Sequence, residues 1–256
     1  MCELLGVSSD RKIELNHLLR TFYGHSAEHP NGWGLAFFDD GNISIEREPI
    51  KASDSFYLRS RLTGELKSSR MMAHIRRATI GEICYENTHP FISKDITGRT
   101  WVLMHNGTIF EAQDLARYQC SQKGTTDSER ILLYLTDKIN DLYRDNKDTT
   151  EEARIRVVDE LVHKLSQHNK LNLLIFDGDN FYVHKNEEGT LHRYDHNGIA
   201  ILSTHPLTRE GWEEVPKNRL LVYKDGRQIY EGKTHDNTYI HNEENMKALY
   251  LGYSGL

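Results

Sequence analysis

The fold is decided by residues 33–48, WGLAFFDDGNISIERE, in which apolar and β-branched side chains lie on both sides of Asp40-Gly41. An Asp-Gly pair between two such runs is the strongest short-range signal for a β-hairpin. The same pattern recurs in residues 171–184, LNLLIFDGDNFYVH, and in residues 219–230, RLLVYKDGRQIY. Three hairpins predict a largely antiparallel sheet structure.

Three segments with helical periodicity accompany these strands. Residues 16–28 carry large apolar side chains at helical spacing and are followed by a Pro-Asn-Gly breaker. Residues 126–144 and 151–168 repeat Leu, Ile and Val every three or four positions, and Thr126 or Asp127 caps the first of these two helices. The helices must cover the sheets, so we expect an α+β protein: sheet packed on sheet with helices outside, or two layers. The pattern does not choose between these arrangements.

Composition bounds the class of protein. The 256 residues contain no linker, so we expect a single domain over residues 2–256, with a polar, partly ordered tail from about residue 232. A net charge of -6 argues against nucleic-acid binding. The N-terminus lacks the features of a signal peptide, and no apolar run approaches the roughly 18 residues of a membrane span. We therefore expect a cytoplasmic protein that does not bind membranes.

Cysteines and histidines give no sign of a metal site. Cys2, Cys84 and Cys120 are too few and too scattered for a disulfide framework or a zinc motif, which predicts free thiols. The 14 histidines include no HExxH pair or other ligand spacing. We expect packing or hydrogen-bonding roles for them, no metal and no cofactor.

Cys2 directly follows the initiator Met, whose removal ahead of a small residue is efficient. The new N-terminus would carry a thiol and an α-amine on one residue. Because an α-amine titrates near pH 8, it can take the thiol proton at neutral pH, and the nucleophile then needs no His or Asp partner. The alternative interpretation is a cysteine that stands at position two without a catalytic role. Considered without the rest of the sequence, Cys2 favours this alternative.

A second cluster, MHNGTI at residues 104–109, ends a predicted buried strand. The Asn106 amide and the Gly107 backbone N–H could donate to one oxygen, as in an oxyanion hole. An ordinary Asn-Gly turn is an equally good interpretation. The glycosylation sequon at Asn106 is set aside because no signal sequence precedes it.

Two further clusters could bind the ends of an amino acid. In AHIRRATIG, residues 73–81, Arg76 could grip a carboxylate with two parallel hydrogen bonds and Thr79 could add a hydroxyl. In GTTDSE, residues 124–129, Asp127 could accept from an ammonium, or could simply cap a helix. Together with Cys2 and the Asn-Gly pair, these residues suit an α-amino acid whose side-chain carbonyl is attacked, and glutamine fits that description.

The order of these four motifs resembles the class II glutamine amidotransferases. NGWGLAFF at residues 31–38, ENTHPF at 86–91 and STHPLT at 203–208 are similar to the stand-alone YafJ-type branch and extend the likeness toward residue 230. The resemblance implies the four-layer αββα sandwich of N-terminal nucleophile hydrolases. It also implies that Cys2, Asn106 and Gly107 are catalytic, and that Arg76, Thr79 and Asp127 bind substrate.

The resemblance leaves three functions open. Arg77 and Ile80 stand where biosynthetic relatives usually carry an aromatic residue and, in some, His, so the substrate is glutamine or a γ-glutamyl metabolite. An amidotransferase of this kind would hand ammonia to a separate protein, whereas an amidohydrolase would not. The third alternative is an inactive binding or regulatory module that kept the pocket.

Overall fold

Two antiparallel sheets form the body of the protein. The computed structural model describes residues 2–39, 41–146 and 150–254, so Met1 and the hairpin residue Asp40 lie outside the described residues. One sheet has seven strands in the order β11-β9-β10-β1-β4-β2-β3, and the other has six in the order β13-β12-β8-β7-β6-β5. All their pairings are antiparallel, as the hairpin signals predict.

The strands are β1 (Glu3–Glu14), β2 (Trp33–Asp39), β3 (Asn42–Glu48), β4 (Lys67–Ile75), β5 (Phe91–Lys94), β6 (Thr100–Thr108), β7 (Lys170–Phe176), β8 (Phe181–Lys185), β9 (His192–His196), β10 (Ile199–Ser203), β11 (Trp212–Glu214), β12 (Arg219–Lys224) and β13 (Arg227–Glu231). The helices are α1 (Asn16–Gly24), α2 (Phe56–Arg61), α3 (Gln113–Ala116), α4 (Asp127–Asn146), α5 (Glu151–Leu165) and α6 (Glu243–Ser254), with short 3₁₀ turns η1 (His25–Glu28), η2 (Ala52–Asp54) and η3 (Tyr85–Asn87).

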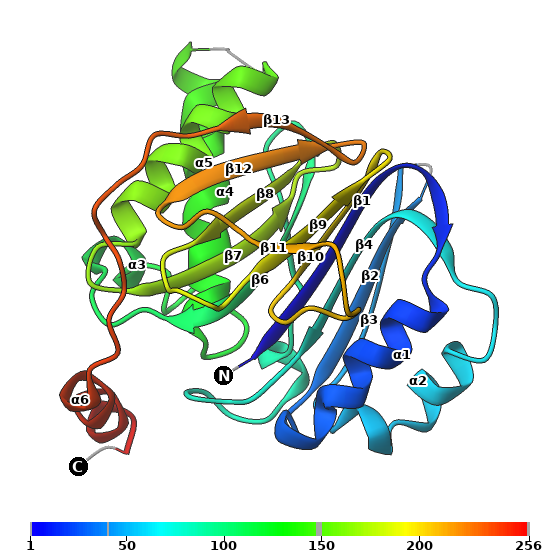
Figure 1. Cartoon of the computed structure of the whole chain (residues 1–256). Coiled ribbons are helices and arrows are strands. Elements are labelled where there is room, and N and C mark those ends of the chain that lie inside the picture. Colours follow the sequence, from blue (N-terminus) through cyan, green and yellow to red (C-terminus); the bar gives the residue numbers. More distant parts are fainter. Residues whose placement is uncertain (1, 40, 147–149, 255–256) are drawn as a thin grey trace.

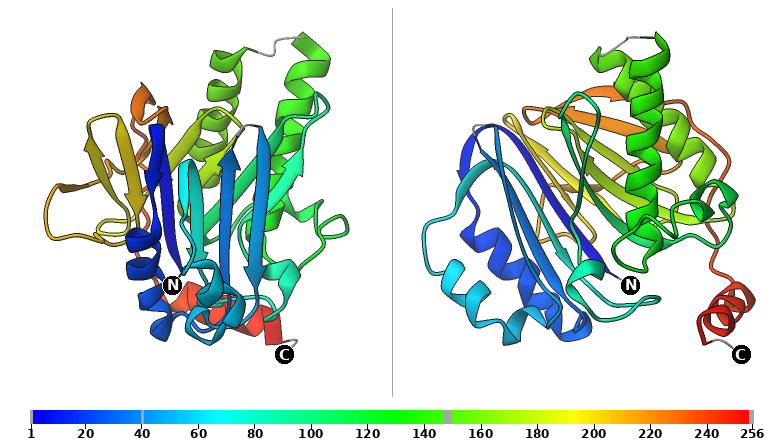
Figure 2. Two further views of the ribbon diagram at one scale, coloured as in Figure 1. Left: turned by 90° about the vertical axis from the view of Figure 1, so that its right-hand side faces the viewer. Right: turned by 180° about the vertical axis from the view of Figure 1, so that it is seen from behind.

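The sheets stack face to face with helices outside, which makes four layers (Figures 1 and 2). Helices α1 and α2 cover the seven-stranded sheet, and α4 and α5 cover the six-stranded sheet. Alternation along the strands explains the layering, because in β1 Leu4 joins the core between the sheets while Leu5 and Val7 pack toward α1. Strand β7 is buried along its whole length because both of its faces are covered. The expected αββα sandwich is therefore confirmed.

The hairpins form where the sequence predicts them. β2 pairs with β3, β7 with β8, and β12 with β13. At the last turn Asp225 and Gly226 both have positive φ, 48° and 72°, as a type I′ turn requires. Of the helices, the segment expected over residues 16–28 is α1 followed by the 3₁₀ turn η1, and α5 ends at Leu165, three residues before the expected limit.

The C-terminal stretch is more ordered than the sequence suggests. His235 N–H donates to Asn218 O at 2.9 Å and Tyr239 N–H to Asn186 O at 2.8 Å, which ties this segment to the end of the six-stranded sheet. It then leads to α6, which stands apart from the sandwich (Figure 1). Among the described helices, none has the length and apolar composition that crossing a membrane requires.

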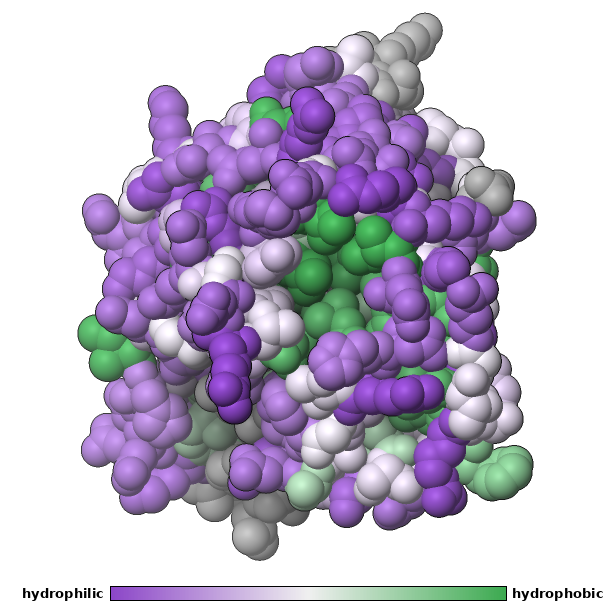
Figure 3. All heavy atoms as spheres, turned by 45° about the vertical axis from the view of Figure 1, so that its right-hand side comes forward, coloured by the Kyte–Doolittle hydropathy of each residue, from purple (hydrophilic) through white to green (hydrophobic). Residues whose placement is uncertain are grey.

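Helices α1 and α2 leave part of the seven-stranded sheet uncovered. Figure 3 brings this side forward and shows a hollow of hydrophobic residues bordered by hydrophilic ones. Ile13, Ile201 and Trp212 are partly buried members of the core on this face.

Antiparallel pairing gathers three predicted motifs at one end of the sandwich. Glu3, at the start of β1, is opposite Ile75, at the end of β4. The end of β6 is opposite the start of β7, with Thr108 facing Lys170. Strands β1 and β6 contact each other across the two sheets. The N-terminal cysteine, the end of β4 and the end of β6 therefore meet.

Candidate active site

Cys2 lies half-buried immediately before β1. Its Sγ donates to the carbonyl oxygen of Arg77 at 3.5 Å, which holds the thiol beside the loop that follows β4. Side chains alternate along the extended chain, so Cys2 faces the same way as Leu4, into the space between the sheets. Burial raises the pKa of the Cys2 thiol, while the nearby Arg76 guanidinium acts in the opposite direction.

Asn106 and Gly107 lie within β6, so the interpretation of this pair as a turn is wrong. Asn106 is 1% exposed and has the same orientation as Met104, toward the space between the sheets. Among the described residues, no group hydrogen-bonds its Oδ1. At Gly107 an added Cβ would lie 2.1 Å from the Lys170 carbonyl oxygen, so only glycine fits there.

His105 anchors this strand on its other face. Its Nε2 lies 3.2 Å from Lys170 O and its Nδ1 lies 3.1 Å from Ser128 Oγ. A carbonyl only accepts, so the Nε2 carries the proton, and the Ser128 hydroxyl lies between His105 Nδ1 and Asp127 Oδ1, which is 3.3 Å away. Burial lowers the pKa of His105, consistent with a neutral ring. His105 thus ties the oxyanion candidates to β7 and to the start of α4, a role that sequence reasoning missed.

Asp127 is buried at the first position of α4. Its Oδ2 accepts from Ile109 N–H at 2.8 Å and its Oδ1 from Ser128 N–H at 2.8 Å. The helix cap is Thr126, whose Oγ1 accepts from Glu129 N–H at 3.4 Å. A carboxylate has about four acceptor positions, so Asp127 keeps capacity for an ammonium.

Arg76 follows β4 and is 3% exposed. Its Nη1 donates to Glu82 O at 2.9 Å, and its Nη2 donates to Ile80 O at 3.1 Å and to Gly81 O at 3.4 Å. Three donors of the guanidinium therefore hold the loop in which Thr79 lies half-buried. The remaining two donors, or all five once the loop moves, are available for a carboxylate.

The branch motifs position this loop. Asn31 Oδ1 accepts from Ala78 N–H at 2.9 Å, and Asn87 Nδ2 donates to Glu82 O at 3.0 Å. Asn87 Oδ1 also accepts from Thr125 N–H at 2.7 Å, which joins the loop to the chain just before Asp127. The NGWG and ENTHPF stretches thus hold the loop on Arg76.

Histidines surround the site without forming a metal centre. The His74 and His89 rings lie 4.2 Å apart, and burial holds the pKa of each well below its usual range. No group of three or more His, Cys, Asp or Glu within the described ranges is placed to hold a metal ion.

Glu3 is a further charged residue that sequence reasoning missed. Its carboxylate is 5% exposed and faces three imidazoles: His25 Nδ1 at 2.9 Å, His29 Nε2 at 3.7 Å and His205 Nε2 at 3.9 Å. These contacts fix the start of β1, directly after Cys2. The available signal was the histidine of STHPLT, which had no assigned partner.

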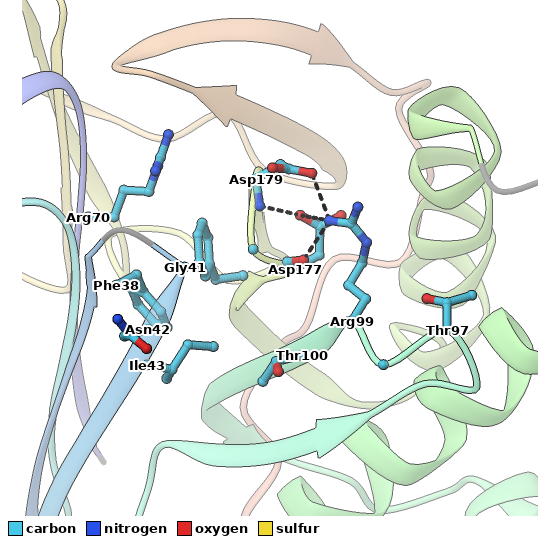
Figure 4. A pocket seen from close by; sticks show the side chains of 13 residues that line it. Phe38, Gly41, Asn42, Ile43, Arg70, Thr97, Arg99, Thr100, Asp177 and Asp179 are labelled. Carbon is cyan, nitrogen blue, oxygen red and sulfur yellow. Dashed lines mark hydrogen bonds and ion pairs between the residues drawn. The ribbon is translucent and has the colours of Figure 1, made fainter.

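A cavity of about 410 Å³ lies at the opposite end of the sandwich, among the turns of three hairpins (Figure 4). Arg99 pairs with Asp179 at 2.7 Å on the wall formed by the six-stranded sheet, and Arg70, on the opposite wall, pairs with Asp225 at 2.6 Å. Arg70 and Arg76, close in sequence, therefore lie at opposite ends of β4. This cavity has no part in the cluster around Cys2.

The αββα sandwich has the fold of the N-terminal nucleophile hydrolases, and one of its ends gathers Cys2, the Asn-Gly pair and a buried arginine. Residues 1–194 match the family model described as glutamine amidotransferases class-II. The chain belongs to this family.

The chain is also similar to two curated proteins and shares its fold with a solved structure. The chain is 29% identical to YafJ of Escherichia coli, over 70% of each chain. It is 24% identical to the gamma-glutamyl-hercynylcysteine sulfoxide hydrolase of Mycolicibacterium smegmatis, over 80% of this chain and 82% of the relative. The glutamine phosphoribosylpyrophosphate amidotransferase from B. subtilis has the same fold, with a TM-score of 0.66 at 16% identity, covering 93% of this chain and 50% of that one.

Proposed function

We propose that the protein hydrolyses the γ-amide of glutamine through the Cys2 thiol, once Met1 has been removed. The observation that carries this proposal is the position of the Asn106 amide, which is 1% exposed and lies in the same space between the sheets as the thiol. Its Nδ2 is a hydrogen-bond donor, so it suits a substrate carbonyl oxygen that becomes negatively charged during the reaction.

In the acylation step the α-amine of Cys2 takes the thiol proton and Sγ attacks the carbonyl carbon of the side-chain amide, forming a C–S bond. Asn106 Nδ2 and the Gly107 N–H stabilise the oxyanion. The C–N bond then breaks, the α-ammonium gives its proton to the leaving nitrogen, and ammonia departs. In deacylation the α-amine takes a proton from water, the new C–O bond forms, and the C–S bond breaks to release glutamate and the thiol.

Arg76 and Asp127 would hold the two ends of the α-amino acid. The guanidinium binds the α-carboxylate, with Thr79 beside it, and the carboxylate accepts from the α-ammonium. Since loop carbonyls occupy three donors of Arg76, we expect the loop to shift when substrate binds.

The test is release of glutamate from glutamine by protein whose N-terminus is verified by mass spectrometry. Cys2→Ala should abolish release. A matched control keeps Cys2 but carries an uncleavable residue before it, which retains the thiol and blocks the amine. We expect the control to be inactive as well. Activity in Cys2→Ala refutes the nucleophile, and activity in the extended chain refutes the α-amine as base.

A second candidate is hydrolysis of a γ-glutamyl compound. It is favoured by the likeness to the hydrolase of M. smegmatis and by the exposed side chain of Arg77, which stands where the biosynthetic relatives usually carry an aromatic residue. Comparing glutamate release from glutamine with that from γ-glutamyl amides separates the two.

An amidotransferase would also need an acceptor for ammonia, and we propose a separate protein for this role. A pull-down with the untagged N-terminus should recover it, and recovery of no partner counts against it. We also propose a cytoplasmic location, which the three free cysteines suit.

A further inference from the structure

A partly buried ion pair lies at the start of β7, opposite the end of β6 that carries Asn106 and Gly107, and has no part in the scheme above. Lys170, the first residue of β7, has a side chain that is 4% exposed, and its Nζ contacts Glu187 Oε2. Burying two charges costs more than their attraction returns unless the geometry is excellent. Retention of such a pair next to a reactive group points to a role in the site.

The register of β7 places this ammonium in the space between the sheets. Leu171 and Leu173 pack toward α4 and α5, whereas Leu174 faces the other sheet, so Lys170 points the same way as Leu174. Its carbonyl oxygen abuts Gly107. Burial lowers the pKa of Lys170, while the Glu187 carboxylate and, more weakly, Cys2 act in the opposite direction.

Strand order shows on which side of Cys2 the pair lies. Strands β4 and β10 flank β1 in one sheet, and β5 and β7 flank β6 in the other. Gly34 of β2 abuts the carbonyl of His89, just ahead of β5, so the β4 side of the first sheet meets the β5 side of the second. Arg76, after β4, and Lys170, on β7, therefore lie on opposite sides of Cys2.

The C-terminal segment borders the same side. Tyr239 donates its backbone N–H to Asn186 O, next to Glu187, and its ring stacks on Phe110 with centroids 6.0 Å apart. An aromatic pair therefore lies close to the Glu187 end of the ion pair.

The carbonyl carbon of a γ-amide carries the glutamyl chain on one side and the leaving nitrogen on the other, and these two substituents point away from each other. If Arg76 holds the α-carboxylate, the leaving nitrogen points toward Lys170. We infer that Lys170, oriented by Glu187, binds a carboxylate carried by the leaving amine, so that the substrates of this site are γ-glutamyl amino acids or peptides. This inference rests on the proposed function. Ammonia, the leaving group from glutamine, has no group for a cation to bind.

The test compares γ-glutamylglycine with γ-glutamylmethylamide, which differ only in the leaving-group carboxylate, and uses glutamine as reference. Wild-type protein with a verified Cys2 N-terminus should favour γ-glutamylglycine in kcat/KM by about tenfold or more, the scale of one charge-assisted hydrogen bond. Lys170→Met should remove this preference and Lys170→Arg should keep most of it. Activity on glutamine should change much less than activity on γ-glutamylglycine.

Lys185→Met is the matched control. Lys185 is a buried lysine at the end of β8, paired with Glu214, and its loss should lower stability without changing the preference. Equal kcat/KM of wild type for the two amides overturns the inference. So does an equal loss of kcat/KM on all three substrates in Lys170→Met. Loss of the preference for γ-glutamylglycine in Lys185→Met overturns it as well. If wild type cleaves glutamine but shows no preference for γ-glutamylglycine over γ-glutamylmethylamide, only this inference fails. If no amide is cleaved, the proposed function fails with it.

Discussion

Replacing Asn106 with alanine removes the side-chain amide that shares the space between the sheets with the Cys2 thiol. Loss of one oxyanion donor costs about 100- to 1,000-fold in kcat, or about 2.7–4 kcal/mol of transition-state stabilisation. Because Asn106 Oδ1 has no hydrogen-bond partner among the described residues, the truncation breaks no bond of that oxygen. The free energy of unfolding should therefore fall by less than about 2 kcal/mol.

The assay is steady-state release of glutamate, with KM and kcat determined separately, and urea unfolding on the same samples. KM should change little, because the donor acts on charge that develops in the transition state. Asn172→Ala is the matched control: Asn172 is opposite Asn106 on β7, and its Nδ2 donates to Thr190 Oγ1 at 3.0 Å. We expect it to lower stability and to keep kcat within about threefold. If Asn106→Ala keeps kcat within that range, or changes only KM, the oxyanion assignment is wrong.

Three further changes test the geometry. In Gly107→Ala the new Cβ would lie 2.1 Å from Lys170 O, so β6 must shift. We expect kcat to fall by at least about 100-fold and Tm to fall as well. If kcat and Tm are both unchanged, the close approach of β6 and β7 at Gly107 is wrong. In Arg76→Lys the ammonium cannot bridge the carbonyls of Ile80, Gly81 and Glu82, so proteolysis of this loop should increase. KM for glutamine should rise about tenfold or more, because a lysine cannot bind the α-carboxylate with two parallel hydrogen bonds. An unaltered KM argues against carboxylate binding by Arg76. Burial lowers the pKa of His184 to about 3 and that of His235 to about 4, so the unfolded chain binds more protons and stability falls as pH drops below about 6.5. Urea unfolding at pH 6.5 and pH 5 should differ by about 2 kcal/mol from His184 alone, and the difference should shrink in His184→Asn; an equal difference in both proteins refutes this origin.

Local signals account for much of the fold. The Asp-Gly pairs predicted the hairpins because tight turns need positive φ, which few residues adopt: Asp225 and Gly226 both have it, and Gly178 has it in the turn between β7 and β8. The helix expected from residue 126 is α4, capped by Thr126, one of the two candidates. Helix α6 was missed because it stands apart from the sandwich, so no strong apolar stripe was needed to bury it (Figure 1).

Roles that depend on long-range contacts were harder to predict. His105 and Glu3 are single residues, and nothing near them in sequence indicates that they bind Ser128 or the imidazoles around β1. Lys170 is separated from Gly107 by 63 positions, and only the β6 and β7 register brings them together. An isolated lysine in an apolar run carries no signal of its own.

The sequence by itself determined the chemical groups around Cys2: the thiol at position two, the Asn-Gly pair, the arginine after β4 and the aspartate at the start of α4, in an order typical of one family. These are short motifs whose chemistry is local. Only the tertiary structure decided that Asn106 and Gly107 lie within a strand instead of a turn, that Arg76 binds its own loop, and that Lys170 lies opposite Arg76 across Cys2. The physical reason is that hydrogen bonds and charges act through space, and strand pairing, not sequence distance, sets which of them are neighbours.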